Sequence, residues 1–433
     1  MKFLFWKCWT LILLLSLVVG CNSSSSKNEN EKTLPNQVLT AAEILGNPDY
    51  LAISYGGYRQ KSRDIQPTIE ELKEDMKILF AMGIRILRTY NTKLPHAKNV
   101  LKAIQELKKE DSKFEMYVMV GVWIDCENAW TDKPNHEKEN EEANAAEIQR
   151  AVQMATEYPD IVKVIAVGNE AMVKWAASYY VQPKVILKWV NHLQELKSKD
   201  QLSKDLWITS SDNFASWGGG DSTYHTKDLT QLIKAVDYIS MHTYPMHDTH
   251  YNPNFWGILN SEKDISKLEK IDKAMERSGN YAKLQYQNTV NYIRSLGVQK
   301  PVHIGETGWA TASNGFYGKE GSQATDEYKS ALYYRFIRNW TAREKIACFY
   351  FEAFDEPWKD ANNAGGAENN FGLFTVDGQA KYALWDQVDQ GVFKALGRSG
   401  NPISKTYNGE KRKLLEEVFS PAVNSEIVES VYQ

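Results

Sequence analysis

Short apolar runs alternate with longer amphipathic segments along the chain from residue 51 onward. The runs are apolar nearly throughout, which is typical of parallel strands that are covered on both faces. Helices are expected in the segments between them. The eight predicted strands are 51–55, 84–89, 116–123, 161–169, 206–211, 236–243, 301–305 and 347–354.

Helix start and stop signals agree with this alternation. Thr68–Glu71 has the sequence of a capping box, apolar residues then follow on one helical face, and Gly83 ends the helix. The segment 281–296 repeats the scheme with Gly297 as its stop. Eight strand–helix units in one continuous stretch predict an α/β fold, a closed (β/α)8 TIM barrel in a single domain, rather than an open sheet.

One connection is much longer than the others. The sixth and seventh predicted strands begin at residues 236 and 301, so this unit takes 301 − 236 = 65 residues. The excess, residues 245–279, follows the C-terminal end of a strand, the face where barrels of this kind carry their active sites. We therefore expect an enlarged loop after strand six that forms part of a substrate cleft.

The N-terminal segment has the pattern of a targeting signal. Lys2 and Lys7 precede a short apolar run, 11–19, which is too short to span a membrane and is typical of a secretory signal. Val18–Cys21 resembles a bacterial lipobox, which implies cleavage before Cys21 and a lipid on its thiol. The alternative is an ordinary signal peptide with an incidental cysteine. The prediction is an exported lipoprotein of the cell envelope.

The domain plan follows from these segments. We expect a lipoprotein signal peptide at 1–20, a flexible tether at 21–47 with four consecutive serines, a catalytic barrel at 48–396, and a polar C-terminal extension at 397–433.

Composition narrows the choice of partner. A net charge of −4 and few clustered basic residues argue against a nucleic-acid partner. The 13 Trp and 23 Tyr residues are plentiful, and flat rings suit the apolar faces of sugars as well as a protein core. After loss of Cys8 and acylation of Cys21, only Cys126 and Cys348 remain, and we expect both to stay free.

Two glutamates end predicted strands and are the strongest candidates for chemistry. Glu170 closes the fourth apolar run and Glu306 closes the seventh. Strands four and seven lie on opposite sides of an eight-stranded ring, so these carboxylates can face each other across its mouth. Facing carboxylates are what cleavage of a glycosidic bond requires, one as an acid and one as a nucleophile or stabiliser. Salt bridges at a loop rim are the alternative interpretation.

The same segments resemble a known family. Val167–Glu170 and Gly305–Trp309 look like the two signature motifs of glycoside hydrolase family 17, the β-1,3-glucanases, and Phe351–Lys359 is a third match. The resemblance covers about residues 48 to 395. Plant members typically carry Pro where Ala310 stands, which affects details of sugar binding and leaves the general chemistry intact.

The resemblance implies a retaining endo-β-1,3-glucan hydrolase of the laminarin type, with Glu170 as the general acid/base and Glu306 as the nucleophile. It also implies that Asn169 donates a hydrogen bond to the sugar 2-hydroxyl. Arg88 is expected to hold Glu306 ionised, with a structural ion pair as the alternative, and Tyr244 to touch the nucleophile through its hydroxyl. The full set of expected substrate-binding residues is Tyr55, Arg88, Asn169, His242, Tyr244, Trp309, Glu352, Glu356 and Lys359.

Among these, Trp309 is expected to form a sugar platform, because it follows the nucleophile so closely. Weaker candidates for stacking on sugars are Trp123, Trp217, Trp256 and Trp358. A metal site is not expected, since the spacing of His242, His247, Asp248 and His250 forms no closed ligand pattern and this hydrolysis needs neither metal nor cofactor.

Three alternatives remain open at this point. The chain could transfer glycosyl units to another glucan, act on β-1,4 or β-1,6 linkages with the same fold, or capture glycan without cleaving it. The expected partners are a β-glucan and, through Cys21, a membrane; the domain itself is expected to be a monomer.

Overall fold

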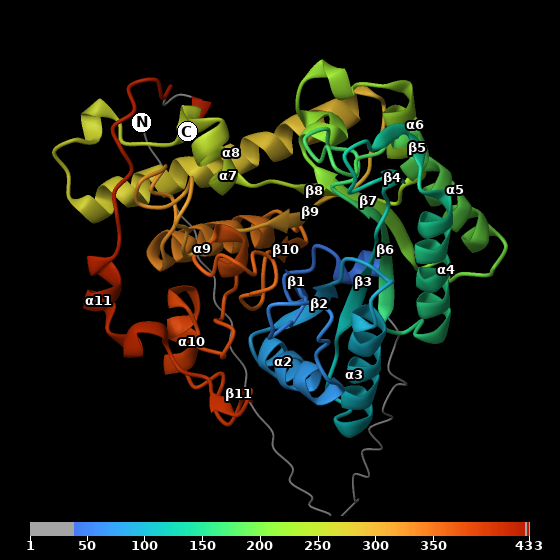
Figure 1. The fold of residues 1–433 in the computed structure, drawn as a ribbon, viewed down its shortest axis with the longest axis horizontal. Helices are drawn as coiled ribbons and strands as arrows, with labels where there is room; N and C mark the ends of the chain where they lie inside the picture. Colours follow the sequence, from blue (N-terminus) through green and yellow to red (C-terminus); the bar gives the residue numbers. More distant parts are fainter. Residues whose placement is uncertain (1–38, 429–430, 433) are drawn as a thin grey trace, which may run out of the picture. The chain divides into compact units, whose positions relative to one another are not determined.

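The computed structural model describes residues 39–428 and 431–432 (Figure 1). The predicted signal peptide, the lipidation site at Cys21 and most of the predicted tether lie outside the described residues. Among the helices that the structure describes, none is both long enough and apolar enough to cross a bilayer.

Eight parallel strands close into a barrel, as predicted. Going around it, the order is β1-β10-β9-β8-β7-β6-β3-β2. The strands are β1 Leu51–Ser54, β2 Ile84–Arg88, β3 Tyr117–Val122, β6 Val162–Asn169, β7 Trp207–Asn213, β8 Ile239–His242, β9 Val302–Thr307 and β10 Cys348–Tyr350. Their register places Asn169 beside Ser211 and His242 beside Glu306, so polar residues from separate strands meet at the C-terminal mouth.

The last strand is shorter than the predicted run 347–354. Beyond Tyr350 the N–H groups of Phe351 and Ala353 still donate to the barrel strands, at Thr307 and Ser54. Those of Glu352 and Asp355 donate instead to Phe371 and Phe374, so the regular strand ends at Tyr350. Apolar character alone could not show this change of partner.

Helices surround the barrel and bury its outer face. They are α2 Ile69–Ala81, α3 His96–Glu110, α4 Glu141–Glu157, α5 Pro183–Ser198, α6 Lys227–Ala235, α8 Lys267–Ser295 and α9 Glu327–Arg343. The capping box predicted for α2 is present, because the Glu71 N–H donates to Thr68 Oγ1 at 3.2 Å and the Thr68 N–H donates to Glu71 Oε2 at 2.8 Å. A short hairpin, β4 Cys126–Glu127 and β5 Asn135–Glu139, interrupts the connection between β3 and α4.

A second apolar cluster fills the lower part of the barrel lumen. Helix α1, Ala41–Ile44, closes its base with Ile44 and Leu45. Residues 41–47 were assigned to the tether from sequence, and this boundary is wrong: Ala41 and Ile44 are fully buried against the strands. The other buried members of this cluster are Ala52, Ile86, Tyr117, Met119, Val164, Ala166, Tyr238, Ala347 and Phe349.

The enlarged connection after β8 is present but divided differently from the prediction. It holds α7 Pro245–Tyr251 and two single-turn helices, Pro253–Phe255 and Asn260–Glu262. Helix α8 then begins at Lys267, well before the predicted start at residue 281, because Ser266 and Glu269 form a capping box. Residues 267–279 of the predicted insertion therefore belong to α8, and only residues 245–266 form the separate connection.

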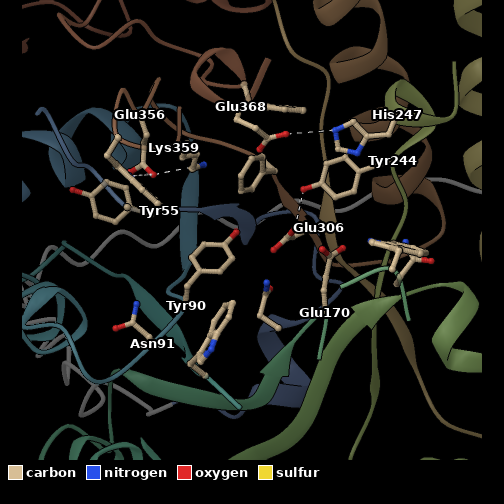
Figure 2. A pocket seen from close by; sticks show the side chains of 18 of the residues that line it. Tyr55, Tyr90, Asn91, Glu170, Tyr244, His247, Glu306, Glu356, Lys359 and Glu368 are labelled. Carbon is tan, nitrogen blue, oxygen red and sulfur yellow. Dashed lines mark hydrogen bonds and ion pairs between the residues drawn. The ribbon is translucent and has the colours of Figure 1, made fainter. Parts of the chain in front are cut away.

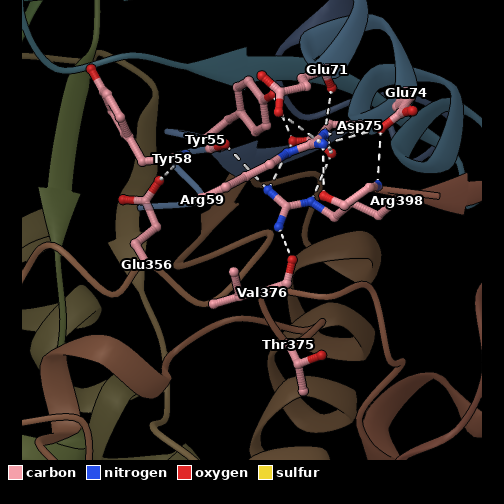
Figure 3. A network of polar contacts seen from close by, with 12 residues as sticks. Tyr55, Tyr58, Arg59, Glu71, Glu74, Asp75, Glu356, Thr375, Val376 and Arg398 are labelled. Atoms are coloured by element: carbon pink, nitrogen blue, oxygen red, sulfur yellow. Dashed lines mark hydrogen bonds and ion pairs between the residues drawn. The ribbon is translucent and has the colours of Figure 1, made fainter. Parts of the chain in front are cut away.

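The C-terminal segment wraps the barrel and is tied into it. It contains α10 Trp385–Asp389, the hairpin of β11 Gly397–Arg398 and β12 Asn401–Pro402, and α11 Lys411–Glu416. Arg398 is fully buried and donates to both carboxylate oxygens of Asp75 on α2, at 2.8 and 3.1 Å (Figure 3). Arg59 donates to the same carboxylate at 3.1 Å. The predicted domain boundary at residue 397 therefore separates residues that belong to one core.

Candidate active site

A cleft of about 1390 Å³ crosses the mouth of the barrel (Figure 2). The loops or ends of all eight strands contribute to its walls, and aromatic and polar side chains predominate there. Both predicted catalytic residues, Glu170 and Glu306, line it. The first part of the long connection after β8 does so as well, through His247, Asp248 and Tyr251, as predicted for that insertion.

Glu170 is presented by a sharp turn at the end of β6. Gly168 has a φ of +85° and Glu170 itself a φ of +46°. The Glu170 N–H donates to the carbonyl of Ser211 on β7 at 3.0 Å, which holds the turn. A residue other than glycine in this left-handed region is uncommon and is typical of functional sites. The turn leaves the Glu170 side chain 24% exposed at the cleft.

Glu306 lies opposite, on β9, and its side chain is only 7% exposed. One carboxylate oxygen of Glu306, one of Glu170 and a ring nitrogen of His242 all lie within 4.8 Å of one another. Retaining glycosidases hold their two carboxyl groups about 5–5.5 Å apart, whereas inverting enzymes need about 6.5–9.5 Å to admit a water. The observed spacing favours retention.

Arg88, at the end of β2, connects the nucleophile candidate to Asn169. Its Nη1 donates to Glu306 Oε1 at 2.5 Å and to the carbonyl of Gly305 at 2.8 Å. Its Nη2 donates to Asn169 Oδ1 at 2.6 Å. Because a guanidinium group only donates, this contact places the amide oxygen of Asn169 toward Arg88 and leaves its NH2 group available to a ligand. The structure thus brings Arg88, Asn169 and Glu306 together as predicted.

Tyr244 and His242 complete the surroundings of the two carboxylates. The Tyr244 hydroxyl donates to Glu306 Oε2 at 2.8 Å. His242 is fully buried beneath the cleft: its Nδ1 lies 3.1 Å from Glu170 Oε1 and 3.6 Å from Glu306 Oε2, and its Nε2 lies 2.7 Å from Ser211 Oγ. His242 therefore contacts the catalytic pair from below, rather than contributing a surface to the cleft.

The electrostatic balance favours an ionised Glu306. Burial alone would raise the pKa of this carboxyl, but His242, Arg88 and the hydrogen bond from Tyr244 outweigh it and hold the pKa below its usual value. A nucleophilic carboxylate has to be ionised, so this direction suits the role predicted for Glu306.

The trio of Glu170, His242 and Glu306 also has the composition of a cation site. Arg88 already supplies the positive charge at Glu306 Oε1, at 2.5 Å, and a cation there would lie beside that guanidinium group. The geometry is better explained by the carboxylate pair and its hydrogen-bonding partners.

The other residues considered as metal ligands from sequence contact different side chains. His247 lies 3.8 Å from Glu368, and Asp248 accepts hydrogen bonds from Tyr281 and Gln285. His250 stacks on Phe316.

A second charged group lies on the wall formed by the segment after β10. Lys359 Nζ bonds to Glu352 Oε1 at 2.6 Å and lies 3.6 Å from Glu356 Oε2. Glu356 and Lys359 line the cleft, whereas Glu352 lies behind them with 2% exposure. Burial, reinforced by neighbouring Glu356, raises the pKa of Glu352 well above its usual value despite the opposing charge of Lys359. Glu352 is thus a support for the cleft wall.

The prediction for Trp309 is wrong. Its side chain is fully buried, its Nε1 donates to the carbonyl of Ala324 at 2.8 Å, and it packs against Trp256 and Tyr333. Trp309 lies beyond the end of β9 at Thr307, where the side chain can turn outward into the helical layer as readily as inward toward the cleft. Trp217 and Trp256 are core residues too.

Other aromatic candidates do reach the cleft. Trp123 and Trp358 line it. Tyr55 is part of the wall, but its hydroxyl donates to Asp75 Oδ2 at 3.0 Å and is already engaged.

Several residues of the cleft escaped the sequence analysis. Tyr90 lines it with a buried hydroxyl that has no hydrogen-bonding partner within the described residues, and Figure 2 shows this ring facing the two carboxylates. Trp130, Trp175 and Tyr251 line it with exposures of 60–62%. All but Tyr90 lie in loops or a short helix without strand periodicity; Tyr90 could have been found from its position two residues after Arg88.

Asp212 supports the turn that carries the acid candidate. It is fully buried on β7, and its Oδ2 accepts the N–H of Met172, two residues after Glu170, at 2.7 Å. Burial raises the pKa of Asp212 to about 6, although hydrogen bonds from Ser216 and Met172 oppose the shift. Asp212 is the second-last residue of β7 and directly follows the predicted run 206–211, so the argument that identified Glu170 and Glu306 as strand-end carboxylates could also have found it.

Comparison with known proteins shows which family the domain belongs to. The family model of the BtgE/BtgC glycoside hydrolase domain matches residues 52–372, which spans the barrel from β1 to the segment after β10. The chain belongs to this glycoside hydrolase family. The predicted membership of the family 17 group of β-1,3-glucanase-like enzymes is thereby confirmed, and so is the assignment of this domain as a glycosidase.

This glycoside hydrolase domain is similar to solved structures. An endo-laminarinase from Formosa Hel1_33_131 is 69% identical, with a TM-score of 0.89, and the match covers 90% of this chain and 99% of that one. A glycoside hydrolase family 17 β-1,3-glucanosyltransferase from Rhizomucor miehei is 19% identical with a TM-score of 0.51, covering 77% and 96% of the two chains, and shares the fold.

Curated relatives are longer proteins. A probable glucan endo-1,3-β-glucosidase btgC of Aspergillus fumigatus is 26% identical over 322 residues, which is 71% of this chain and 38% of that protein. The chain spans less than half the length of the Aspergillus relatives that it matches.

Proposed function

We propose that the protein is a retaining endo-β-1,3-glucan hydrolase that acts on laminarin-type glucans. The observation that carries the proposal is the pair of facing carboxylates, Glu170 and Glu306, with oxygens within 4.8 Å in a cleft bordered by all eight strands. The linkage is supported by 69% identity to a protein named as an endo-laminarinase. A cleft that crosses the whole mouth suits attack within a chain.

The reaction takes two steps in this geometry. The Glu306 carboxylate attacks the anomeric carbon while the Glu170 carboxyl gives its proton to the departing glycosidic oxygen, so that a glycosyl ester forms on Glu306 and the leaving chain departs as an alcohol. The Glu170 carboxylate then takes a proton from water, which attacks the same carbon and releases Glu306. Two inversions leave the configuration retained.

Neighbouring residues prepare both steps. Arg88 and Tyr244 donate to the two oxygens of Glu306, at 2.5 and 2.8 Å, which orients the carboxylate and keeps it ionised. Because the amide oxygen of Asn169 accepts from Arg88, its NH2 group is free to serve as the donor to the sugar 2-hydroxyl in this proposal. Tyr90, Glu356 and Lys359 offer further polar atoms at the wall.

Incubation with linear β-1,3-glucan, beside β-1,4- and β-1,6-glucan, tests this proposal. The products are separated by length, and their first-formed anomer is read by NMR. Oligosaccharides of several lengths with β configuration at the new reducing end are expected from β-1,3-glucan alone. Cleavage of another linkage would reject the substrate, α products would reject the retaining mechanism, and no cleavage of any glucan would favour a protein that only binds glycan.

Transfer to a second glucan is the alternative that a specific observation favours. Exposed aromatic residues line the same cleft as Glu170, among them Trp130 and Trp175, and such rings can hold an acceptor in place of water. Incubation of one purified β-1,3-oligosaccharide at high concentration separates the two activities, since oligomers longer than the starting material arise only by transfer.

We further propose that the protein is an exported lipoprotein anchored through Cys21, as the sequence of residues 18–21 suggests. Growth with a labelled fatty acid tests this. The label is expected on the processed protein, which begins at Cys21, in the membrane fraction and is expected to be absent from Cys21→Ser. Equal labelling of both would reject the anchor.

A further inference from the structure

Three aromatic side chains from two separate loops pack together at one side of the cleft. Trp130, in the loop of the β4–β5 hairpin, stacks on Tyr179 with ring centroids 4.9 Å apart and planes 23° apart. Trp123, just after β3, lies 5.0 Å from Tyr179 and 6.2 Å from Trp130. We call these three residues the Trp130 platform. Trp123 and Trp130 line the cleft.

Trp130 is held in an unusual position. It is 62% exposed and has a φ of +64°. A bulky residue in the left-handed region costs on the order of 1 kcal/mol or more and persists only where its surroundings impose it. Here the Trp130 N–H donates to Ser178 O at 2.8 Å, and the N–H of Cys126 donates to Tyr179 O at 3.1 Å. The two loops are thus joined by backbone hydrogen bonds that present the indole ring to the cleft.

The platform lies on the side of the acid. Ser178 and Tyr179 belong to the connection that begins at Glu170. The N–H of Val181 donates to the carbonyl of Ala171 at 2.7 Å, which folds this connection back to the residue after Glu170. Tyr179, two residues before Val181, carries the stacked Trp130 on this side of the cleft. Because the acid protonates the oxygen of the leaving chain, the sugar beyond that oxygen lies toward this side.

We propose that the Trp130 platform binds a glucosyl ring of the leaving chain, a subsite that rests on the proposed function. A β-linked glucosyl unit carries its hydroxyls at the edge of the ring and C–H groups on its faces, so that a flat indole can cover one face without desolvating a hydroxyl. The packed rings have little conformational freedom to lose when the sugar binds. The same surface would hold the acceptor in a transfer reaction.

Two variants and two substrates test the subsite. Trp130→Gly removes the ring at a position where glycine adopts the observed φ without strain, and Trp130→Phe retains a flat ring. Phe316→Ala, which removes a ring that is 57% exposed outside the cleft lining, is the matched control. The substrates are a long linear β-1,3-oligoglucoside and a dinitrophenyl β-1,3-oligoglucoside, whose leaving group is one small aryl ring.

For Trp130→Gly we expect kcat/KM on the long oligoglucoside to fall about threefold to tenfold, the size of one aromatic contact. On the aryl substrate kcat/KM should stay within about twofold. Trp130→Phe should recover most of the loss, and Phe316→Ala should show none.

Equal losses on both substrates would overturn the subsite, because a general disturbance of the site affects every leaving group, and unchanged kinetics on both would overturn it as well. Failure of the proposed function is a distinct result: the unaltered protein would then cleave neither substrate, and the subsite would fall with it.

Discussion

The base and the mouth of the barrel are built from the same eight strands, yet they have opposite chemistry. On β2, Ile86 faces the base and Arg88, two residues later, faces the mouth. On β6, Val164 and Ala166 lie in the base cluster, whereas the strand ends at Asn169 beside Arg88. The base is apolar and closed by helix α1; the mouth holds buried charges around Glu306.

This difference shows how the fold separates stability from chemistry. In the base, the Tyr238 hydroxyl reaches Met119 Sδ at 3.7 Å and nearly everything else is hydrocarbon. At the mouth, the hydroxyl of Tyr90, which lines the cleft, has no partner within the described residues, which is the condition expected where a ligand supplies the missing contact. Changes in the base should therefore alter unfolding, and changes in the mouth should alter turnover.

The largest effect is expected at the mouth, from Glu306→Gln. Glutamine can still accept from Arg88 and Tyr244 but cannot form the glycosyl ester, so kcat on β-1,3-glucan should fall at least roughly 10⁴-fold. The midpoint temperature of thermal unfolding should change far less than it does for Phe349→Ala in the base. Turnover within tenfold of the unaltered protein would show that Glu306 is not the nucleophile.

In the base, Phe349→Ala is expected to reduce the free energy of unfolding by about 3–5 kcal/mol, since it leaves a cavity in a fully packed cluster. Urea unfolding followed by fluorescence measures this. The kcat of the folded variant, assayed at a temperature well below its unfolding transition, should stay within about twofold. A large fall in kcat without loss of stability would contradict the separation of base from mouth.

Arg88→Lys should have an intermediate effect. One ammonium group cannot bond to Glu306 and Asn169 together, so kcat/KM is expected to fall about 10- to 100-fold. Arg85→Lys is the control, because Arg85 lies on the same strand with its guanidinium over Phe80, outside the cleft.

The pH profile gives Arg88→Lys a specific signature. With the pKa of Glu306 held below its usual value of 4.5, the ascending acid limb of kcat/KM should lie below pH 4.5, and it should move to higher pH in the variant. The lowered pKa also means that ionised Glu306 contributes stability above the unfolded pKa, and this contribution is lost as the pH falls through the folded value. An unmoved limb would show that Arg88 does not set this ionisation.

The smallest effect on activity is expected from Trp309→Phe. This change loses the hydrogen bond from Nε1 to Ala324 and some packing, which should cost about 1–3 kcal/mol of stability. KM for β-1,3-glucan should be unchanged, since the ring does not reach the cleft. A several-fold rise in KM would restore the sugar-platform role predicted from sequence.

The strands and the two catalytic candidates were predictable because their signals are local. An apolar run predicts a buried parallel strand, and a glutamate directly after such a run is placed at the mouth by the barrel itself. Arg88, Asn169 and Tyr244 followed by the same argument together with the family resemblance. Helix α2 was predictable because its capping box and stop glycine are encoded in adjacent residues.

What could not be predicted depends on contacts between distant segments. Helix α1 is only four residues long, and it is stabilised by packing against the base of the barrel that it closes. Trp309 and Trp130 are the same residue type beside catalytic elements, and only the packing shows that the first is core and the second exposed. The exposed rings of the cleft lie in connecting segments, and the hydrophobic periodicity of the sequence does not predict the conformation of such segments.

The contact between Arg398 and Asp75 has a consequence for how the molecule is made. These residues are 323 positions apart, and Asp75 also receives the Tyr55 hydroxyl from the cleft wall. A growing chain therefore holds Asp75 without its principal partner until synthesis is nearly complete. Strand β10, which closes the barrel, is also synthesised late. The catalytic mouth is thus among the last parts of the molecule that can fold, and a chain released early contains both carboxylates but lacks the segments that complete the cleft walls around them.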